Sequence, residues 1–570
     1  MNKLKRLFVS AVAIVMLLSA LGFAGCKRDI IIEDAKTINV RVFSGGYGSD
    51  WIYELKSKFE AAYAREGYKV NILTPSLDLR GDVVINELLD GNEKTGIDLY
   101  FTTDIYAETV ATGDYGMLVE DLTDDVFNKP AIGFDGQEES VTIKSKIKPG
   151  ADVSMLATVA DEDRYFGFNW VSSVGGLAVN TKKLDAYGFE LPKTTNEMLD
   201  TFQAIYLGTN GRPNSEEAKT FPITYVQGSN GYTLCMLNAL FAQYTGYDNF
   251  ERFWSLIDMD GTPMTTDGNT VFEDQGLYEM LKVAYATFDP RIAAYGSQSQ
   301  SVDQAQGKIM SDLGTNDAIF MCVGDWMLNE VRLNYPNKLN EIEFINFPVI
   351  SALGVELFGE GSSYKLDDEA CDELLSYLVG LVDENLDIDE IVSRTQTEKG
   401  ITISEADARR VAEARGVYFS RGVEHLAFIP KNARAAEPAK LLLRMFASED
   451  FAPIFAQTTN GTSPYTESVN TDTPYKFVEE ASRIAVNQYA SIIISYPTGL
   501  RRDLSLMTMF TNYRHIPMAI VEQEISMFDG KGNIESGKTR QVYADAAKKM
   551  WESEKKNVND NWKDWIKGLD

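Results

Sequence analysis

Residues that build metal sites and disulfide frameworks are scarce in this sequence. Its 570 residues include 2 histidines and 4 cysteines. His425 and His515 lie far apart along the chain, and the cysteines match no zinc-binding spacing, so the sequence predicts no metal site. Cys235, Cys322 and Cys371 each stand among apolar residues. We expect them to be small buried hydrophobic side chains, with one disulfide among them as the alternative.

Positive charge is also scarce. Lysine and arginine number 54 against 84 acidic residues, which gives a formal net charge of −30. A protein that binds nucleic acid through a basic patch neutralises phosphates and needs the opposite balance, so we expect no nucleic-acid partner. Broad adsorption to anionic lipid headgroups is disfavoured for the same reason. The charge also favours a neutral ligand over a strongly anionic one.

Long apolar runs are absent except at the N-terminus. There, Lys3, Lys5 and Arg6 precede an apolar stretch over residues 7–20. This pattern is typical of a secretory signal, and the stretch is shorter than the roughly 20 residues that a membrane-spanning helix needs. No later segment approaches 18 continuous apolar residues, so we expect no further membrane span.

The signal ends in a motif that resembles a bacterial lipobox. Small residues precede Cys26, although Phe23 stands where the lipobox usually has leucine. The resemblance implies cleavage before Cys26 and diacylation of its thiol, while an ordinary signal peptide is the alternative. Removal of the three basic residues of the signal would change the formal net charge from −30 to −33.

The region after the signal alternates strand and helix patterns. Ile38–Phe43 alternates apolar and polar residues, which predicts a strand, and the apolar spacing after Asp50 predicts a helix that ends near Gly67. Further elements are expected at 68–73 (strand), 82–89 (helix) and 96–101 (strand). Such alternation predicts a parallel sheet, in which ligands bind beyond the carboxyl ends of the strands. Tyr47 and Asp104, which follow the first and third strands, are therefore expected near a cleft.

Two short motifs fail the requirements of the sites that they resemble. Gly45–Gly48 lacks both the GxGxxG spacing and the lysine of a phosphate-binding loop, so we expect a tight turn that exposes Tyr47. Asp258–Gly261 begins like an EF-hand loop but lacks the glycine at position 6 and the glutamate at position 12. We expect a hairpin over 254–272 there instead.

Several stretches along the chain resemble, in order, those of family 1 of the extracellular solute-binding proteins, the sugar-type receptors of ABC importers. The matching stretches are 165–180, 183–199, 318–326 and 447–464. They include a Phe-Gly turn, a small-residue run ending in Leu-Ala-Val-Asn, a Pro-Lys-Thr segment, a Gly-Asp-Trp segment and a Gly-Thr-Ser-Pro segment. Asn169 departs from the family pattern, which has proline at this position.

The resemblance implies an α/β, two-lobed, periplasmic-binding-protein-like (type II) fold with discontinuous lobes joined by a hinge. We expect a signal peptide at 1–25, a lipidated tether at 26–37, lobe 1 at 38–155 and 305–360, and lobe 2 at 156–304 and 423–570. Residues 361–422 are acidic and helical in pattern, and we expect a helical insertion that a typical member of the family lacks. The helical pattern from about residue 503 is expected to pack on lobe 2.

A sugar site combines aromatic platforms with hydrogen-bonding side chains and needs neither a catalytic group nor a cofactor. The candidate platforms are aromatic residues beside turns or glycines, namely Tyr47, Trp170, Trp326 and Tyr364. The candidate hydrogen-bonding residues are Asp104, Asn169, Ser172, Asp325 and Asn460. For each of these side chains, ordinary packing, capping or solvation is the alternative.

The resemblance implies a monomeric lipoprotein at the outer face of the bacterial cell membrane. It would capture a carbohydrate, expected to be an oligosaccharide, and deliver it to the permease subunits of an ABC importer. One alternative is a secreted glycoside hydrolase, which would need two carboxylates flanking the bond that it cleaves. Another is the same fold with a peptide, polyamine or metal chelate as ligand. Because no catalytic motif is found, we expect binding rather than catalysis.

Overall fold

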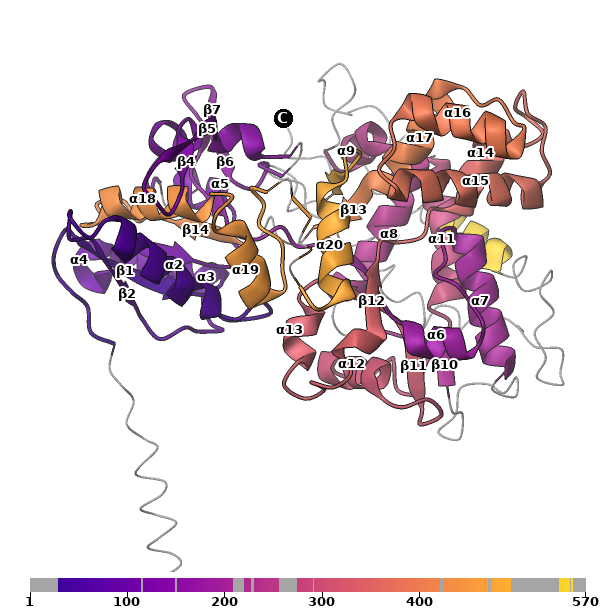
Figure 1. Ribbon diagram of the computed structural model, residues 1–570, viewed down its shortest axis with the longest axis horizontal. Coiled ribbons are helices and arrows are strands. Elements are labelled where there is room, and N and C mark those ends of the chain that lie inside the picture. Colours follow the sequence, from indigo (N-terminus) through magenta and orange to yellow (C-terminus); the bar gives the residue numbers. More distant parts are fainter. Residues whose placement is uncertain are drawn as a thin grey trace, which may run out of the picture.

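The computed structural model shows two lobes side by side (Figure 1). It describes residues 29–113, 116–148, 151–208, 220–226, 230–255, 274–290, 292–420, 425–466, 468–469, 471, 473–493, 543–553 and 555–556. Cys26 and the signal lie outside the described residues, as do the Asp258–Gly261 motif and residues 494–542, where the expected C-terminal helical pattern begins. No helix among the described residues is long and apolar enough to cross a membrane.

The first lobe is built on a five-stranded sheet. Its strands, in spatial order, are β2 (Lys69–Ile72), β1 (Thr37–Val42), β3 (Leu99–Phe101), β14 (Leu426–Phe428) and β8 (Phe168–Asn169). β1 is parallel to β2 and β3, which confirms the predicted strand–helix–strand alternation. The predicted helix is α2 (Asp50–Ala62), and it buries Trp51, Leu55 and Phe59 on one face, because residues at helical spacing share a side.

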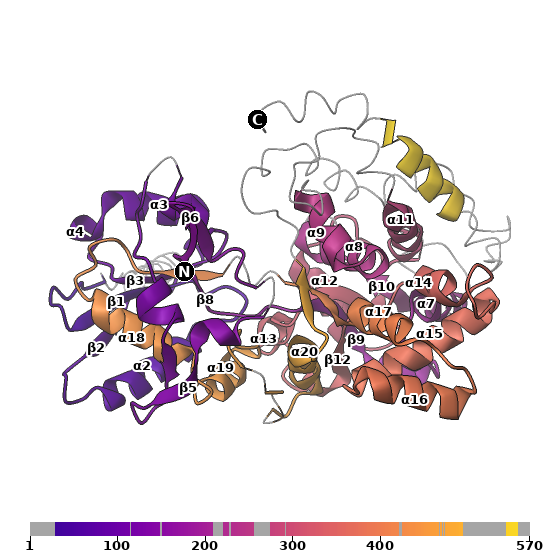
Figure 2. The ribbon, with the colours of Figure 1, turned by 90° about the horizontal axis from the view of Figure 1, so that it is seen from above.

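The other elements of the first lobe surround this sheet (Figure 2). They are α3 (Gly81–Asp90), α4 (Asn92–Thr95), α5 (Ala107–Ala111), a π-helical turn (Thr123–Phe127), β4 (Pro130–Ile132), β5 (Glu138–Thr142), a 3-10 turn (Ile143–Lys146), β6 (Leu156–Val159), β7 (Glu162–Tyr165), α18 (Ala436–Phe446) and α19 (Ala452–Thr459). The aromatic rings of Trp51, Phe101 and Phe446 meet in the core between the sheet and α2 and α18.

The second lobe contains a six-stranded mixed sheet. Its strands are β10 (Thr220–Thr224), β11 (Asp317–Gly324), β9 (Gly175–Asn180), β13 (Val417–Phe419), β15 (Ser491–Ile493) and, also against β9, β12 (Ile342–Ile345). All eight residues of β11 are buried, as expected for a strand covered on both faces. Gly176 lets β12 approach closely, because a Cβ there would lie 2.4 Å from the Ile345 carbonyl oxygen.

Helices cover both faces of this sheet. They are α6 (Thr181–Ala186), α7 (Thr195–Gly208), α8 (Asn230–Thr245), α9 (Tyr247–Ser255), α11 (Gln275–Thr287), α12 (Val302–Met310), α13 (Met327–Val331), a 3-10 turn (Leu339–Glu341), α14 (Ser351–Phe358), α20 (Lys476–Val486) and a helix over 543–553. The last of these packs on the lobe's core through Tyr543 and Ala547. Cys235, Cys322 and Cys371 are buried and form no disulfide with one another, which confirms their prediction as buried side chains.

The expected helical insertion consists of α15 (Asp368–Asp383), α16 (Ile388–Lys399) and α17 (Glu405–Gly416). Each helix starts at a side chain that accepts a backbone N–H bond, from Asp367, Asp387 and Ser404 respectively. Figures 1 and 2 both place these helices on the side of the second lobe that faces away from the first lobe. The insertion ends earlier than expected, because residues 417–419 form β13 in the sheet.

The strand order corrects the expected lobe boundaries. Residues 305–360, expected in lobe 1, contribute β11 and β12 to the second sheet. Residues 156–172 and 425–466, expected in lobe 2, belong to the first lobe through β6, β7, β8, β14, α18 and α19. The crossing strands β8, β13 and β14 have only two or three residues, all buried. The sequence pattern of such short buried strands does not indicate which of the two sheets they join.

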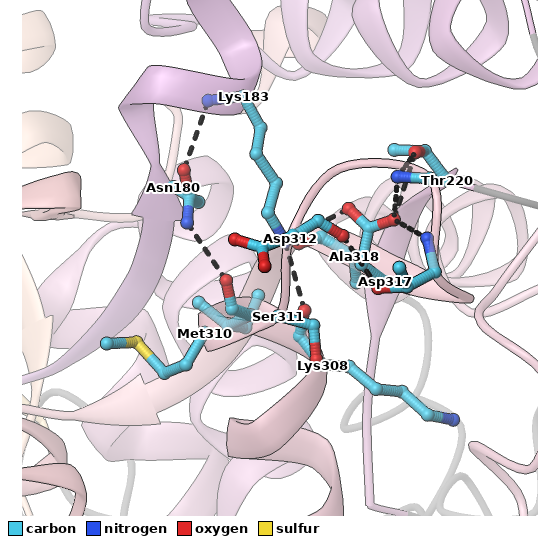
Figure 3. Close-up of polar contacts among 12 residues, drawn as sticks. Asn180, Lys183, Thr220, Lys308, Met310, Ser311, Asp312, Asp317 and Ala318 are labelled. Atoms are coloured by element: carbon cyan, nitrogen blue, oxygen red, sulfur yellow. Dashed lines mark hydrogen bonds and ion pairs between the residues drawn. The ribbon is translucent and has the colours of Figure 1, made fainter. Parts of the chain in front are cut away.

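A buried ion pair lies at the start of β11 in the second lobe (Figure 3). Lys183 Nζ lies 3.0 Å from Asp317 Oδ2, with 4% and 0% of the two side chains exposed. Lys183 also donates to the carbonyl oxygens of Lys308 and Ala318, at 3.1 and 3.0 Å. Asp317 Oδ1 accepts from Thr220 Oγ1 at 3.0 Å. Burial lowers the pKa of Lys183, and the Asp317 carboxylate opposes this shift.

Candidate ligand site between the lobes

A cavity of about 360 Å³ lies between the two lobes. The first lobe contributes Phe43, Gly45, Gly46, Tyr47, Leu77, Arg80, Thr103, Asp104 and His425, and the second lobe contributes Trp326 and Glu330. This position follows from the topology, since Phe43, Thr103 and Trp326 come one or two residues after the carboxyl ends of β1, β3 and β11. The cavity is therefore where an open α/β sheet is expected to bind a ligand.

The glycine-rich loop after β1 carries Tyr47 into the contact between the lobes. Gly46 and Gly48 have φ angles of 63° and 69°, a region that side chains other than glycine rarely adopt. This turn aims Tyr47 at the second lobe, where its hydroxyl donates to Asp325 Oδ1 at 2.7 Å. Tyr47 is 1% exposed, so the expected exposed turn is wrong: Trp170 and His425 of the first lobe and Trp326 of the second pack around its ring.

Asp325 lies behind the cavity at the end of β11. It is 0% exposed, and its Oδ2 atom has no hydrogen-bond partner. Burial raises the pKa of this carboxyl to about 7, against the hydrogen bonds from Tyr47 and from backbone N–H groups, which lower it. Burial of the Tyr47 hydroxyl, together with the Asp325 charge, raises the pKa of Tyr47 well above its ordinary value.

Trp326 forms the aromatic wall that the second lobe contributes. Its side chain is partly exposed, unlike that of Tyr47, and its ring centroid lies 6.1 Å from that of Tyr47. The indole N–H lies 3.4 Å from the Tyr232 hydroxyl. Gly46 packs closely against the indole, since a Cβ at Gly46 would lie 3.6 Å from the Trp326 Cγ atom. The ring is thus held by contacts from both lobes while part of it stays accessible.

Gly324 determines where the Trp326 ring lies. A Cβ at Gly324 would lie 1.9 Å from the Trp326 Cζ3 atom, so Gly324→Ala must displace the ring. Because the displaced indole no longer offers its face to the ligand in the same place, we expect ligand affinity to fall by roughly tenfold, as measured by titration calorimetry. Gly361→Ala is the matched control, since a Cβ there would meet nothing within 4 Å. Equal affinities in the two variants would contradict this role of Gly324.

Charged side chains complete the cavity wall. Arg80 lies 4.0 Å from Asp104 and 5.6 Å from the Phe43 ring centroid. Asp104 has a φ of 59°, a conformation that is uncommon for residues other than glycine and that turns the segment after β3 toward the cavity. From the other lobe, Glu330 accepts from Gln306 Nε2 at 2.5 Å, and burial raises its pKa to about 7.

Four of the predicted ligand residues meet at this cavity. Tyr47, Asp104 and Trp326 line it, and Asp325 lies directly behind Tyr47. Trp170 does not line it. It is 0% exposed, stacks on Trp51 with centroids 5.4 Å apart, and donates its indole N–H to the Thr102 carbonyl oxygen.

Three further predicted residues, Asn169, Ser172 and Asn460, are buried in the connection between the lobes. Asn169 Oδ1 accepts from the backbone N–H of Val171, which holds the turn after β8. Ser172 donates its backbone N–H to the Thr462 carbonyl oxygen at 2.8 Å. Asn460 ends α19 with a φ of 52°, so it serves as a helix cap. In this structure these residues join the crossing segments rather than line the cavity.

Tyr364 lies outside the site, between α14 and α15. Its hydroxyl donates to Asp407 at 2.6 Å and accepts from the Ser404 backbone N–H at 2.9 Å. We expect Tyr364→Phe to leave ligand affinity unchanged and to lower the free energy of unfolding by about 1 kcal/mol, the typical net value of a lost hydrogen bond. Calorimetric titration and denaturant unfolding of the same preparation measure both quantities. A loss of affinity would contradict the placement of the site.

Four residues that line the cavity were not among the predicted ligand residues: Phe43, Arg80, Glu330 and His425. Phe43 was recoverable, because it directly follows β1. Glu330 could also have been predicted, because it lies one helical turn after Trp326 and residues at this spacing share one side of a helix. His425 was missed because its segment was assigned to the other lobe; its ring lies 5.9 Å from Tyr47. Nothing in the sequence points to Arg80. No cluster of His, Cys, Asp and Glu side chains within the described ranges could hold a metal ion.

No family model matches the chain, and no curated protein matches it. Solved structures do. A chitin oligosaccharide binding protein is 12% identical, with 90% of this chain and 100% of that chain covered and a TM-score of 0.51. A probable secreted solute-binding lipoprotein from Streptomyces coelicolor is 14% identical over 90% and 99%, with a TM-score of 0.51. A structure from a study of xylan utilization by the thermophilic bacterium Caldanaerobius polysaccharolyticus is 10% identical over 91% and 99%, with a TM-score of 0.52. The chain has the two-lobed fold that the motif order predicted.

Proposed function

We propose that this chain, which shares the fold of solute-binding proteins, is a receptor that captures a carbohydrate between its lobes and delivers it to an ABC importer. The ligand class that we favour is an oligosaccharide, as for the similar chitin oligosaccharide binding protein. We further propose that the chain is exported and acts as a monomer, held at the outer face of a bacterial cell membrane through lipidated Cys26. The similar Streptomyces coelicolor protein, described as a probable secreted solute-binding lipoprotein, supports this location.

One observation carries the proposal: a single cavity combines aromatic surface with hydrogen-bonding groups from both lobes. Trp326 and Phe43 offer faces on which the C–H side of a sugar ring can pack. Arg80, Asp104 and Glu330 offer donors and acceptors for its hydroxyl groups. Because the walls belong to different lobes, a bound ligand would favour the closed arrangement, as in hinge-type receptors.

A glycoside hydrolase is the second candidate, and the two cavity carboxylates favour it. Asp104 and Glu330 face the cavity from opposite lobes, and the raised pKa of Glu330 is a property of a general acid. We favour the receptor because the similar solved proteins are described as binding proteins. The ligand test must therefore also measure turnover.

The test is a thermal-shift screen of the chain from residue 27 against neutral oligosaccharides, including chitin, xylan and maltose series. We expect at least one series to raise the melting temperature in a concentration-dependent manner, because a ligand that binds only the folded state stabilises it. The same mixtures, analysed by chromatography after prolonged incubation, are expected to contain the intact oligosaccharide. Product that disappears in Asp104→Asn or Glu330→Gln would instead establish the hydrolase.

A further inference from the structure

The segment from Ser44 to Asp50 contacts the second lobe at α13 and at the residues on either side of it. Tyr47 donates to Asp325 Oδ1 at 2.7 Å, and Asn329 Nδ2 donates to the Gly46 carbonyl oxygen at 2.7 Å. One helical turn further, Arg332 lies 3.6 Å from Asp50. All three contacts join the first lobe to the second. We call this set of contacts the interlobe latch.

Asp325 is the unusual member of the latch, because its charge is poorly compensated. It is 0% exposed, no cation among the described residues contributes to its electrostatics, and its Oδ2 atom is buried without a hydrogen-bond partner. An ionised carboxylate in such a place loses its hydration and gains only part of the hydrogen bonding that it had in water. The neutral carboxyl group has a much smaller desolvation penalty.

We propose that Asp325 makes the interlobe latch sensitive to protons, so that the lobes stay closed while its carboxyl group is neutral and separate more readily once it ionises. Separation would return Asp325 to water, because the Tyr47 loop that covers it belongs to the other lobe. This inference goes beyond the proposed function. The contacts of the latch lie within the protein, so the effect of pH on them does not depend on which class of ligand the cavity binds.

The direction of the effect follows from the two states of Asp325. In the closed arrangement burial raises its pKa to about 7, whereas an aspartate in water has a pKa of about 3.9. The closed form therefore binds the proton more tightly, and closure is favoured at low pH and lost as the pH rises through about 7. From pH 6 to pH 9, linkage predicts that the equilibrium constant for closure falls by roughly tenfold, most of it below pH 7, because above its pKa the closed form is ionised as well.

Other titratable groups face Asp325 and must be separated from it. Tyr47 from the loop after β1 and Tyr418 from β13 interact with Asp325, while Glu330 from α13 and the ring of His425 lie beside Tyr47. The pKa values of both tyrosines are raised, so they stay neutral throughout this range. The pKa of Glu330 is also raised to about 7, and Glu330→Gln is therefore the matched control.

The experiment is small-angle X-ray scattering of the ligand-free chain from residue 27, at pH values from 6 to 9, with circular dichroism to establish that it stays folded. We expect the radius of gyration to rise with pH in the parent chain and in Glu330→Gln. In Asp325→Asn, whose amide cannot ionise, it should stay constant. An unchanged radius in the parent chain, a rise in Asp325→Asn, or a constant radius in Glu330→Gln would each overturn the proposal.

Tyr47→Phe keeps the proposal testable if Asp325→Asn does not fold. The lost hydroxyl is a donor that favours the ionised carboxylate, so its removal should shift the midpoint of the pH-dependent opening to higher pH. A midpoint that stays in place, or that moves to lower pH, would contradict the assignment of the latch to Asp325.

Discussion

Trp326→Ala is expected to weaken oligosaccharide binding by about 1–3 kcal/mol, the range found when an aromatic anchor is removed from a binding site. Trp326 is the partly exposed aromatic wall of the second lobe, and the cavity loses its largest apolar face without it. The measurement is a calorimetric titration with the oligosaccharide that gives the largest thermal shift. Because the ring also contacts Tyr47, the titration is to be made at pH 6, where the proposed latch is expected to favour closure.

Two variants separate stacking from packing in this prediction. Trp326→Phe keeps an aromatic face and is expected to recover part of the lost affinity. Tyr364→Phe removes a hydroxyl in a region away from the cavity and is expected to bind as the parent chain does. If Trp326→Ala folds and binds with unchanged affinity, the indole ring is not a ligand platform, and the cavity would have to bind through its polar groups alone.

Asp317→Ala is expected to lower the free energy of unfolding of the second lobe by about 3–5 kcal/mol, the cost of leaving a buried charge without its partner. Lys183 would keep two carbonyl acceptors but lose the only carboxylate with which it pairs among the described residues. Thr220 would lose its acceptor at the same time. The measurement is urea unfolding followed by circular dichroism.

The neighbouring residue provides the control for this prediction. Lys182 pairs with Glu341 at 2.7 Å, but its side chain is 71% exposed. Because exposed ion pairs contribute about 0–1 kcal/mol, Lys182→Ala should change the free energy of unfolding by no more than that. If Asp317→Ala and Lys182→Ala lower the free energy of unfolding equally, burial of the Lys183–Asp317 pair does not increase its contribution to stability.

Local patterns predicted the elements of the first lobe well. The first strand, predicted at Ile38–Phe43 and observed at Thr37–Val42, the helix that buries Trp51, and the parallel third strand all follow from apolar spacing. The pattern could not assign β8, β13 and β14 to their sheets, since short buried strands look the same in either one. Their pairing depends on contacts between residues hundreds of positions apart, such as Thr102 with Leu426.

The residues of the candidate site could be predicted where their position at the end of a strand places them in the cavity. Tyr47, Asp104 and Trp326 follow strand ends, and the topology brings them together. Trp170 also lies beside a turn, but its side chain faces the core and stacks on Trp51, a choice that depends on tertiary packing. Tyr364 follows a glycine–serine turn that leads into the helical insertion, for which the family resemblance offered no guide.

The most direct test of the account is a crystal structure of the chain from residue 27 with the oligosaccharide identified by the thermal-shift screen. We predict density for an intact sugar in the cavity between the lobes, with one ring against Trp326 and hydroxyl groups within hydrogen-bond distance of Arg80, Asp104 or Glu330. Density for the sugar elsewhere on the protein, or for a cleaved product in the cavity, would contradict the account.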